Sequence, residues 1–328
     1  MHIIVRSIRG STPFALGLSF ASLAACSSGE KAGGDSASAA GDTTAAAATA
    51  MFASAGTTDS MKTPESARYD ADLDAYFVSN INGNPSQRDG NGFIVRIDAG
   101  NTSAVTMFAQ GGKNGVTLNA PKGLAIVGDT LWVADIDVAR AFNKRTGAPI
   151  ASVDLKPMKA VFLNDVVAGP DGAVYVTDSG ILFDAKGGMT HPGRDQIFKI
   201  TGRKATVAIA SDSALKSPNG IAWDGANARF VLAPFADNAV TAWKDGDTTV
   251  TPLGTGPGGY DGIEVLADGR TLVTSWADSS VQVMANGTFR KVIGNVDGPA
   301  DIGVDTKRNV VAVPRFNAGR IEYFTISR

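Results

Sequence analysis

Cysteine and histidine are the scarcest reactive residues in this chain of 328 residues, which contains one cysteine, Cys26, and two histidines, His2 and His191. A single thiol cannot form an internal disulfide. So few histidines and cysteines cannot supply the ligand set of a usual zinc site. A Ser-His-Asp triad would have to use His191, and the sequence has no Gly-x-Ser-x-Gly motif. The composition therefore excludes disulfide scaffolds and argues against zinc enzymes and serine hydrolases.

A strong excess of charge of either sign is also absent. The chain carries 30 basic and 32 acidic side chains, and its formal net charge is -2. Because basic and acidic side chains are nearly equal in number, the charge gives no reason to expect nucleic acid as a partner. No long apolar stretch with a helical period follows the N-terminal region, whereas glycine, proline and β-forming residues are plentiful. The sequence therefore predicts an all-β protein.

The first 26 residues have the pattern of an export signal. Arg6 and Arg9 form a basic start, and residues 13–23 form an apolar run that is too short to span a bilayer. The run ends in Leu23-Ala24-Ala25-Cys26, which resembles a bacterial lipobox. In a lipobox the cysteine is lipidated and becomes the new N-terminus. We expect lipidation of Cys26, and the alternative is an ordinary signal peptide with an incidental cysteine.

The sequence divides into three segments with different compositions. Residues 1–26 are the expected lipoprotein signal, residues 27–47 are a tether rich in alanine, serine and glycine, and residues 48–328 are the folded part. This organisation predicts a location in the bacterial cell envelope, facing the periplasm or the exterior. We also expect a monomer. Its contact with the membrane would be made through the lipid anchor alone.

A short phrase recurs six times in the folded part. An apolar run, a turn and a second β-rich run follow each copy, and the copies are roughly 40 to 57 residues apart. This spacing is close to that of propeller blades, and it predicts a six-bladed β-propeller whose innermost strands begin at the phrases. The copies occupy residues 64–67, 121–124, 163–166, 218–221, 260–263 and 299–302. Third strands are expected at residues 92–97, 196–200, 239–243, 281–284 and 320–324.

The last blade lacks a fourth strand in the sequence that follows its third. The segment Ala50-Met51-Phe52-Ala53 precedes Pro64 much as Thr106-Met107-Phe108-Ala109 precedes Pro121. We therefore expect residues 48–55 to pair with the last blade and close the ring, because the blade would otherwise expose an open edge. The alternative is that this segment continues the tether.

Oxygen donors occupy most of the second positions of the phrase. A propeller brings the starts of its innermost strands to one mouth of the channel, so these side chains should form a ring. The six positions hold Glu65, Lys122, Asn164, Asn219, Asp261 and Ala300. Calcium accepts carboxylate and amide oxygens in a loose geometry, whereas magnesium demands a stricter octahedron. We therefore predict that Glu65, Asn164, Asn219 and Asp261 bind Ca²⁺ or another divalent cation. The alternative is that they only cap turns.

Two long segments, residues 80–91 and 179–195, connect expected second and third strands on the same face as this ring. Loops longer than the connection requires are usually functional or disordered. The second segment contains His191. One interpretation is a solvated loop with an incidental histidine. The other is a lid over the metal, with His191 as a proton carrier, a role that suits histidine near neutral pH.

The phrases Pro64-Glu65, Asn164-Asp165, Pro218-Asn219-Gly220 and Asp261-Gly262 resemble the metal-site phrases of the six-bladed gluconolactonase/senescence-marker-protein family and its paraoxonase relatives. The resemblance covers most of the chain after about residue 60. In that family these residues hold a divalent cation, usually calcium, and the enzymes hydrolyse lactones and some esters. The resemblance implies that Glu65, Asn219 and Asp261 are metal ligands, and that Asn164 is a ligand or an amide that contacts the substrate.

Lys122 stands where paraoxonases carry a histidine, and the arginine with which gluconolactonases grip sugar hydroxyls has no clear counterpart here. Lys122 either neutralises the carboxylates and competes with the metal, or contacts the substrate. The expected function is a calcium-dependent hydrolase of lactones or esters, with Asp261 or a water on the metal as the base. The alternatives are a non-enzymatic propeller that binds a ligand or partner at the same mouth and, with less support, a lyase or synthase.

Overall fold

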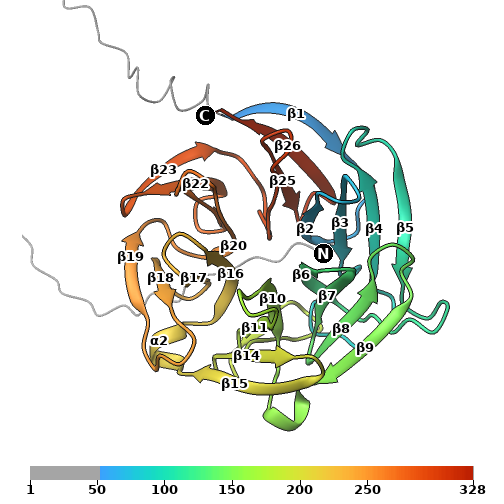
Figure 1. Cartoon of the computed structure of the whole chain (residues 1–328), viewed down its shortest axis with the longest axis horizontal. Helices are drawn as coiled ribbons and strands as arrows, with labels where there is room; N and C mark the ends of the chain where they lie inside the picture. The colour runs from blue at the N-terminus through green and yellow to red at the C-terminus, as the bar shows by residue number, and fades with distance from the viewer. Residues whose placement is uncertain (1–51, 328) are drawn as a thin grey trace, which may run out of the picture.

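The computed structural model describes residues 52–327, whose strands form six four-stranded antiparallel sheets arranged as blades around a central channel (Figure 1). A further two-stranded hairpin lies outside the blades. This architecture confirms the all-β class and the six-bladed propeller. Cys26 and the tether of residues 27–47 lie outside the described residues.

Five of the six innermost strands begin at the first residue of a predicted phrase, whereas the innermost strand of the sixth blade begins at Gly303, directly after its phrase. The second strands coincide with the predicted second β-rich runs. The innermost strands are β2 (Pro64–Asp70), β6 (Pro121–Val127), β10 (Leu163–Ala168), β16 (Pro218–Asp224), β20 (Tyr260–Val265) and β24 (Gly303–Asp305). The second strands are β3 (Ala75–Asn80), β7 (Thr130–Asp135), β11 (Val174–Asp178), β17 (Arg229–Pro234), β21 (Thr271–Ser275) and β25 (Val310–Arg315).

The third strand of each blade is largely buried, and the outermost strand is more exposed to solvent. The third strands are β4 (Phe93–Asp98), β8 (Val138–Asn143), β14 (Gln196–Thr201), β18 (Ala239–Trp243), β22 (Ser280–Ala285) and β26 (Arg320–Ile326). The outermost strands are β5 (Val105–Gln110), β9 (Pro149–Asp154), β15 (Lys204–Ala210), β19 (Thr251–Thr255), β23 (Thr288–Ile293) and β1 (Phe52–Thr58). The extra hairpin consists of β12 (Leu182–Phe183) and β13 (Met189–Thr190), between the second and third strands of the third blade.

Helices play little part in the fold. The helices in residues 52–327 are η1 (Lys156–Met158) and α2 (Asp212–Leu215), and each links one blade to the next. Within the same residues no helix has the length and apolar character needed to cross a membrane.

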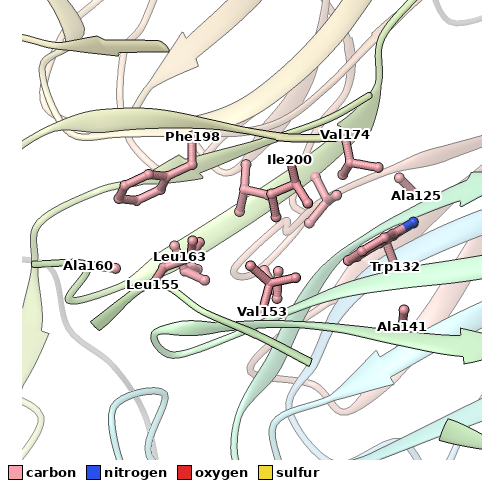
Figure 2. Close-up of a cluster of buried hydrophobic side chains, with 14 residues drawn as sticks. Ala125, Trp132, Ala141, Val153, Leu155, Ala160, Leu163, Val174, Phe198 and Ile200 are labelled. Atoms are coloured by element: carbon pink, nitrogen blue, oxygen red, sulfur yellow. The ribbon is translucent and has the colours of Figure 1, made fainter. Parts of the chain in front are cut away.

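The hydrophobic core consists of separate clusters, each packed between two neighbouring blades. Figure 2 shows the cluster between the second and third blades, in which Trp132 and Val153 of one blade pack near Phe198 and Ile200 of the next. The clusters recur around the ring because each sheet presents apolar side chains on both faces. This packing keeps the innermost strands at fixed positions around the channel.

The sixth blade is completed by the first described strand. Strand β1 pairs antiparallel with β26, from Phe52 opposite Ile326 to Thr58 opposite Ile321. Phe52 is buried and packs in the cluster between the fifth and sixth blades. The predicted closure of the ring is confirmed. The strand continues beyond residue 55 to Thr58, and residues 48–51 of the predicted segment lie outside the described part of the chain.

Candidate metal centre at the channel mouth

A β-bulge marks the start of five of the six innermost strands. The register shifts fall between Pro64 and Ser66 in β2 and between Pro218 and Gly220 in β16, so Glu65 and Asn219 have no partner in the ladder. Equivalent shifts enclose Lys122, Asn164 and Asp261. A bulge bends the strand and redirects side chains. The bulges therefore explain how the second residue of each phrase leaves the sheet and faces the mouth.

Hydroxyl groups from the second strands hold these bulges. Thr274 Oγ1 accepts a hydrogen bond from Gly262 N at 2.7 Å and donates to Ala300 O, in the next blade, at 3.1 Å. Likewise, Thr177 Oγ1 accepts a hydrogen bond from Asp165 N at 2.9 Å and donates to Asn219 O, in the next blade, at 2.7 Å. A bulge removes a backbone N–H from the ladder, and burial makes an unpaired N–H costly. These threonines therefore satisfy the backbone N–H groups that the bulges leave unpaired, and they also join adjacent blades.

Glycine at the third position allows the innermost strands to approach each other. A Cβ atom on Gly220 would lie 2.3 Å from Asp261 O, and one on Gly262 would lie 2.5 Å from the Cα of Asp301. Both contacts are with backbone, which cannot move aside without shifting a strand. The small third residue thus fixes how closely the ring converges.

The predicted ring is the floor of a hollow of about 470 Å³, a volume that includes its open mouth. Glu65, Lys122, Asn164, Asn219 and Asp261 all line it, and each side chain is at least nine-tenths buried. Ala300, at the sixth position, is buried in an apolar cluster beside the hollow rather than in its lining. The structure therefore brings together the four predicted metal ligands and Lys122.

Hydrogen bonds orient the oxygens of this floor. Trp276 Nε1 donates to Asp261 Oδ2 at 2.8 Å. Asn164 Nδ2 donates to Ser179 Oγ at 3.0 Å, which leaves the amide oxygen as the atom available to a ligand.

Two buried carboxylate oxygens on the floor lack a hydrogen-bond partner. They are Glu65 Oε2 and Asp261 Oδ1. An unpaired polar atom that is buried costs free energy, so such atoms call for a proton or a cation. Burial and the nearby acids raise the pKa of Glu65 well above its usual value, and burial raises the pKa of Asp261 to about 8.

Acidic groups outnumber basic ones along the channel. Below the floor, Ser66 Oγ donates to Asp301 Oδ2 at 2.5 Å, and Arg68 forms an ion pair with Glu264. Within residues 52–327, the buried carboxyl groups of the channel face two cationic side chains, Arg68 and Lys122. These carboxyl groups belong to Glu65, Asp165, Asp261, Glu264 and Asp301. A divalent cation at the floor would offset part of this excess.

Lys122 does not occupy the space between the carboxylates. Its Nζ donates to Ala120 O at 3.2 Å and lies 4.1 Å from the centre of the Phe162 ring. Within residues 52–327, no carboxylate oxygen comes within 4.0 Å of this atom. Burial lowers the pKa of Lys122 to about 8, against the opposite effect of Glu65. The lysine therefore leaves the oxygens of Glu65 and Asp261 open to a cation.

The donor set fits a calcium-like cation. In the described part of the chain, no three His, Cys, Asp or Glu side chains are placed to hold a metal ion. A cation would need the amides of Asn164 and Asn219 together with the two carboxylates. Calcium takes such mixed oxygen sets, with water completing its shell, whereas a softer metal would require nitrogen or sulfur ligands.

His191 lies in the predicted loop but not in the lining of the hollow. Its Nε2 is 2.7 Å from Asp195 Oδ1, and Asp195 Oδ2 accepts a hydrogen bond from Ser217 N at 2.7 Å. These contacts fix the base of the loop. The role of His191 as a proton carrier stays a prediction.

The two long loops meet over the hollow, as their place on the mouth face predicts. Asn84 Nδ2 donates to Asp184 O at 2.7 Å, and Phe183 N donates to Ser86 Oγ at 3.0 Å. Pro85 and Phe183 therefore line the hollow from opposite loops.

An apolar wall above the floor was missed by the sequence analysis. Its members are Ile81, Pro85, Phe162, Ile181, Phe183, Phe235, Trp276 and Phe316. Half of the wall residues could have been predicted, because a large apolar residue directly follows the second strand in several blades. Ile81, Phe235, Trp276 and Phe316 occupy that position.

Comparison with solved structures shows the same fold in proteins of different chemistry. Regucalcin from Agrobacterium tumefaciens, described as a calcium-binding protein, has a TM-score of 0.63 and 14% identity, with 84% of this chain and 95% of that chain covered. A gluconolactonase from Xanthomonas campestris gives 0.59 and 13%, covering 82% and 88%. The PQQ-bound aldose sugar dehydrogenase from Streptomyces coelicolor gives 0.62 and 16%, covering 84% and 98%. At these identities the likeness establishes the fold alone.

Sequence comparison identifies the family. No curated protein matches the chain. Residues 42–304 match the family described as SMP-30/Gluconolactonase/LRE-like region, a span that takes in all five bulges and the floor of the hollow. The chain belongs to the SMP-30/gluconolactonase/LRE-like family.

Proposed function

We propose that the chain is a calcium-dependent hydrolase of lactones or esters. The observation that carries the proposal is the pair of unpartnered, buried oxygens, Glu65 Oε2 and Asp261 Oδ1, beside the amides of Asn164 and Asn219. When bound, the cation would supply positive charge that polarises a carbonyl group. Membership of a family named for gluconolactonase supports the reaction class. The calcium-binding description of the structural neighbour regucalcin supports the choice of cation.

In this proposal, the side chains of the floor transfer the proton and stabilise the oxyanion. Trp276 fixes the Asp261 carboxylate, which would accept a proton from the attacking water as the general base. Lys122 places an amine beside the same hollow, where it donates a hydrogen bond to a developing oxyanion or to a carboxylate of the substrate. The loops over the mouth reduce the access of water.

We test the proposed activity on protein stripped with a chelator. A panel of lactones and esters is offered with and without added Ca²⁺, and we expect hydrolysis only with the cation. Asp261→Asn should lower kcat/KM by about a hundredfold or more, because it removes both a ligand charge and a base. Asp59→Asn changes an exposed aspartate and should leave the rate unchanged.

Two other results would revise the proposal. Calcium binding by calorimetry without hydrolysis of any substrate would favour a propeller that only binds a ligand or partner. Hydrolysis that survives chelation unchanged would show that the reaction does not use the cation.

We also propose that Cys26 carries a lipid and anchors the propeller in the bacterial cell envelope, facing the periplasm or the exterior. The lipobox-like segment before Cys26 supports this. In a bacterial host fed labelled palmitate, the full chain should take up the label and Cys26→Ser should not. Equal labelling of the two proteins would contradict lipidation at Cys26.

A further inference from the structure

We propose that the substrate carries an apolar substituent, such as an alkyl chain on a lactone ring, and is not a polyhydroxylated sugar lactone. This inference rests on the proposed function and specifies the substrate class for the same site. It comes from the separation between a polar floor and an apolar wall. All five polar residues of the lining belong to the floor, and the other eight lining residues are hydrophobic.

The wall is built from several blades and is continuous where aromatic rings meet. Trp276 of the fifth blade packs against Phe316 of the sixth, with ring centres 5.5 Å apart, and against Phe235 of the fourth at 6.5 Å. Phe162 and Phe183, both from the third blade, have ring centres 5.8 Å apart. The rings therefore form two arcs around the hollow rather than one isolated contact.

The arrangement sets the orientation of a bound ester. Its carbonyl group must reach the carboxylates, amides and Lys122 at the floor, and the rest of the molecule then lies among aromatic side chains. Trp276 belongs to both regions, because its ring is in the wall and its Nε1 is bonded to Asp261 on the floor. An apolar substituent would gain affinity from burial against the wall.

A sugar lactone would meet the wrong partners. No serine, threonine, tyrosine or arginine is among the lining residues of the hollow within the described chain. The hydroxyl groups of a sugar would lose water at the wall without gaining a hydrogen bond. Each hydroxyl buried in this way would weaken binding by about tenfold.

Phe183 is the member of the wall that is best suited to a test. It lies on the hairpin of β12 and β13, and its backbone bond to Ser86 holds the hairpin across the mouth. Replacing its side chain keeps that backbone bond. Leu182, the preceding residue, is 42% exposed and is not in the lining, so it supplies a matched control on the same hairpin.

The first measurement is kcat/KM for γ-lactones with alkyl chains of increasing length, beside glucono-δ-lactone. We expect kcat/KM to rise by about two- to fourfold per methylene group over the first few carbons, since each buried methylene group contributes a roughly fixed transfer free energy. Phe183→Ser should flatten this dependence, and Leu182→Ser should preserve it. A flat dependence in the unchanged protein, or a preference for the sugar lactone, would overturn the inference while leaving the hydrolase intact.

The second measurement separates the inference from the hydrolase proposal. Alkyl γ-lactams have the shape of the lactones and resist hydrolysis, so their dissociation constants are measured by calorimetry with Ca²⁺ present. We expect affinity to rise with chain length and the rise to be lost in Phe183→Ser. If no lactone is hydrolysed but this rise is seen, the hydrolase is wrong and the apolar ligand stands. Lactam affinity that is independent of chain length would contradict the apolar ligand.

Discussion

Single hydroxyl groups decide whether the bulges that build the floor are stable. Thr274 satisfies Gly262 N in its own blade and bonds to Ala300 O in the next. Its side chain is fully buried, so no water can replace it. The shape of the candidate metal centre therefore depends on a residue that does not touch it.

Replacement of Thr274 by valine keeps the shape of the side chain and removes both hydrogen bonds. We expect a loss of about 1–3 kcal/mol in the free energy of unfolding, because a buried N–H is left without a partner. Urea denaturation measures the loss. Thr248→Val, at an exposed position, serves as the control. Equal stability of Thr274→Val and the unchanged protein would show that the bulge does not need the hydroxyl.

The imidazole of His191 should titrate above its ordinary range. The hydrogen bond to Asp195 raises its pKa, and burial acts in the opposite direction to a smaller extent. Since the folded-state pKa is the higher one, the stabilising contribution is complete below about pH 6.5 and is lost as pH rises through the folded-state value. A proton NMR titration checks this. Asp195→Asn should return the pKa toward 6.5, and an unshifted His191 in the original protein would contradict the ion pair.

Among the elements, β1 closes the ring with a strand from the other end of the described chain. It pairs with β26 along its length and buries Phe52 against the fifth and sixth blades. Without it, β26 would be an exposed edge with unpaired backbone groups.

Deletion of residues 1–61 should therefore lower the melting temperature and promote association of the exposed edge. Deletion of residues 1–46 removes only the signal and most of the tether, so it should leave the melt unchanged and serves as the control. Phe52→Ala in the full chain should cost about 3 kcal/mol in unfolding free energy. Identical melts for the two truncations would argue that β1 contributes little.

Most elements could be predicted because the phrase, the turn after it and the apolar run recur in every blade. The third and outermost strands of the second blade, β8 and β9, were not predicted. Strand β8 carries Arg140 at a buried position, where it forms an ion pair with Asp135, and this charge interrupts the apolar pattern. Strand β9 is mostly exposed and has little pattern to detect.

The candidate site also has a part that could be predicted from the sequence and a part that could not. Its floor could be predicted, because the repeated phrase places one residue of each blade at a common mouth. The wall could not, since residues such as Phe162 and Phe183 belong to loops whose path depends on contacts with other blades. The direction of Lys122 could not be predicted either, because it follows from the Phe162 ring and a backbone carbonyl rather than from the phrase.

For the whole molecule, the proposed function predicts that the excess of buried carboxyl groups along the channel makes stability depend on a cation. At a calcium concentration a hundred times the dissociation constant, binding to the folded state alone adds about 2.7 kcal/mol. For a domain of this size, that corresponds to a rise of about 5 °C in melting temperature.

Calorimetric melts of the chelated protein, with and without Ca²⁺, measure this rise. Asp261→Asn should abolish it, and the exposed Asp59→Asn should keep it. A melt of the original protein that does not respond to Ca²⁺ would remove the metal centre from the proposal.

The pairing of β1 with β26 also dictates an order of events during synthesis. Thr325 Oγ1 donates to Ala53 O across 272 positions of sequence, so the first strand of residues 52–327 can pair only after the last strand of that range has been made. Five blades can assemble from neighbouring segments while the sixth still has only its outer strand, because β24, β25 and β26 are made last. Until the last residues emerge, β1 remains an unpaired strand open to capture by a chaperone or another chain.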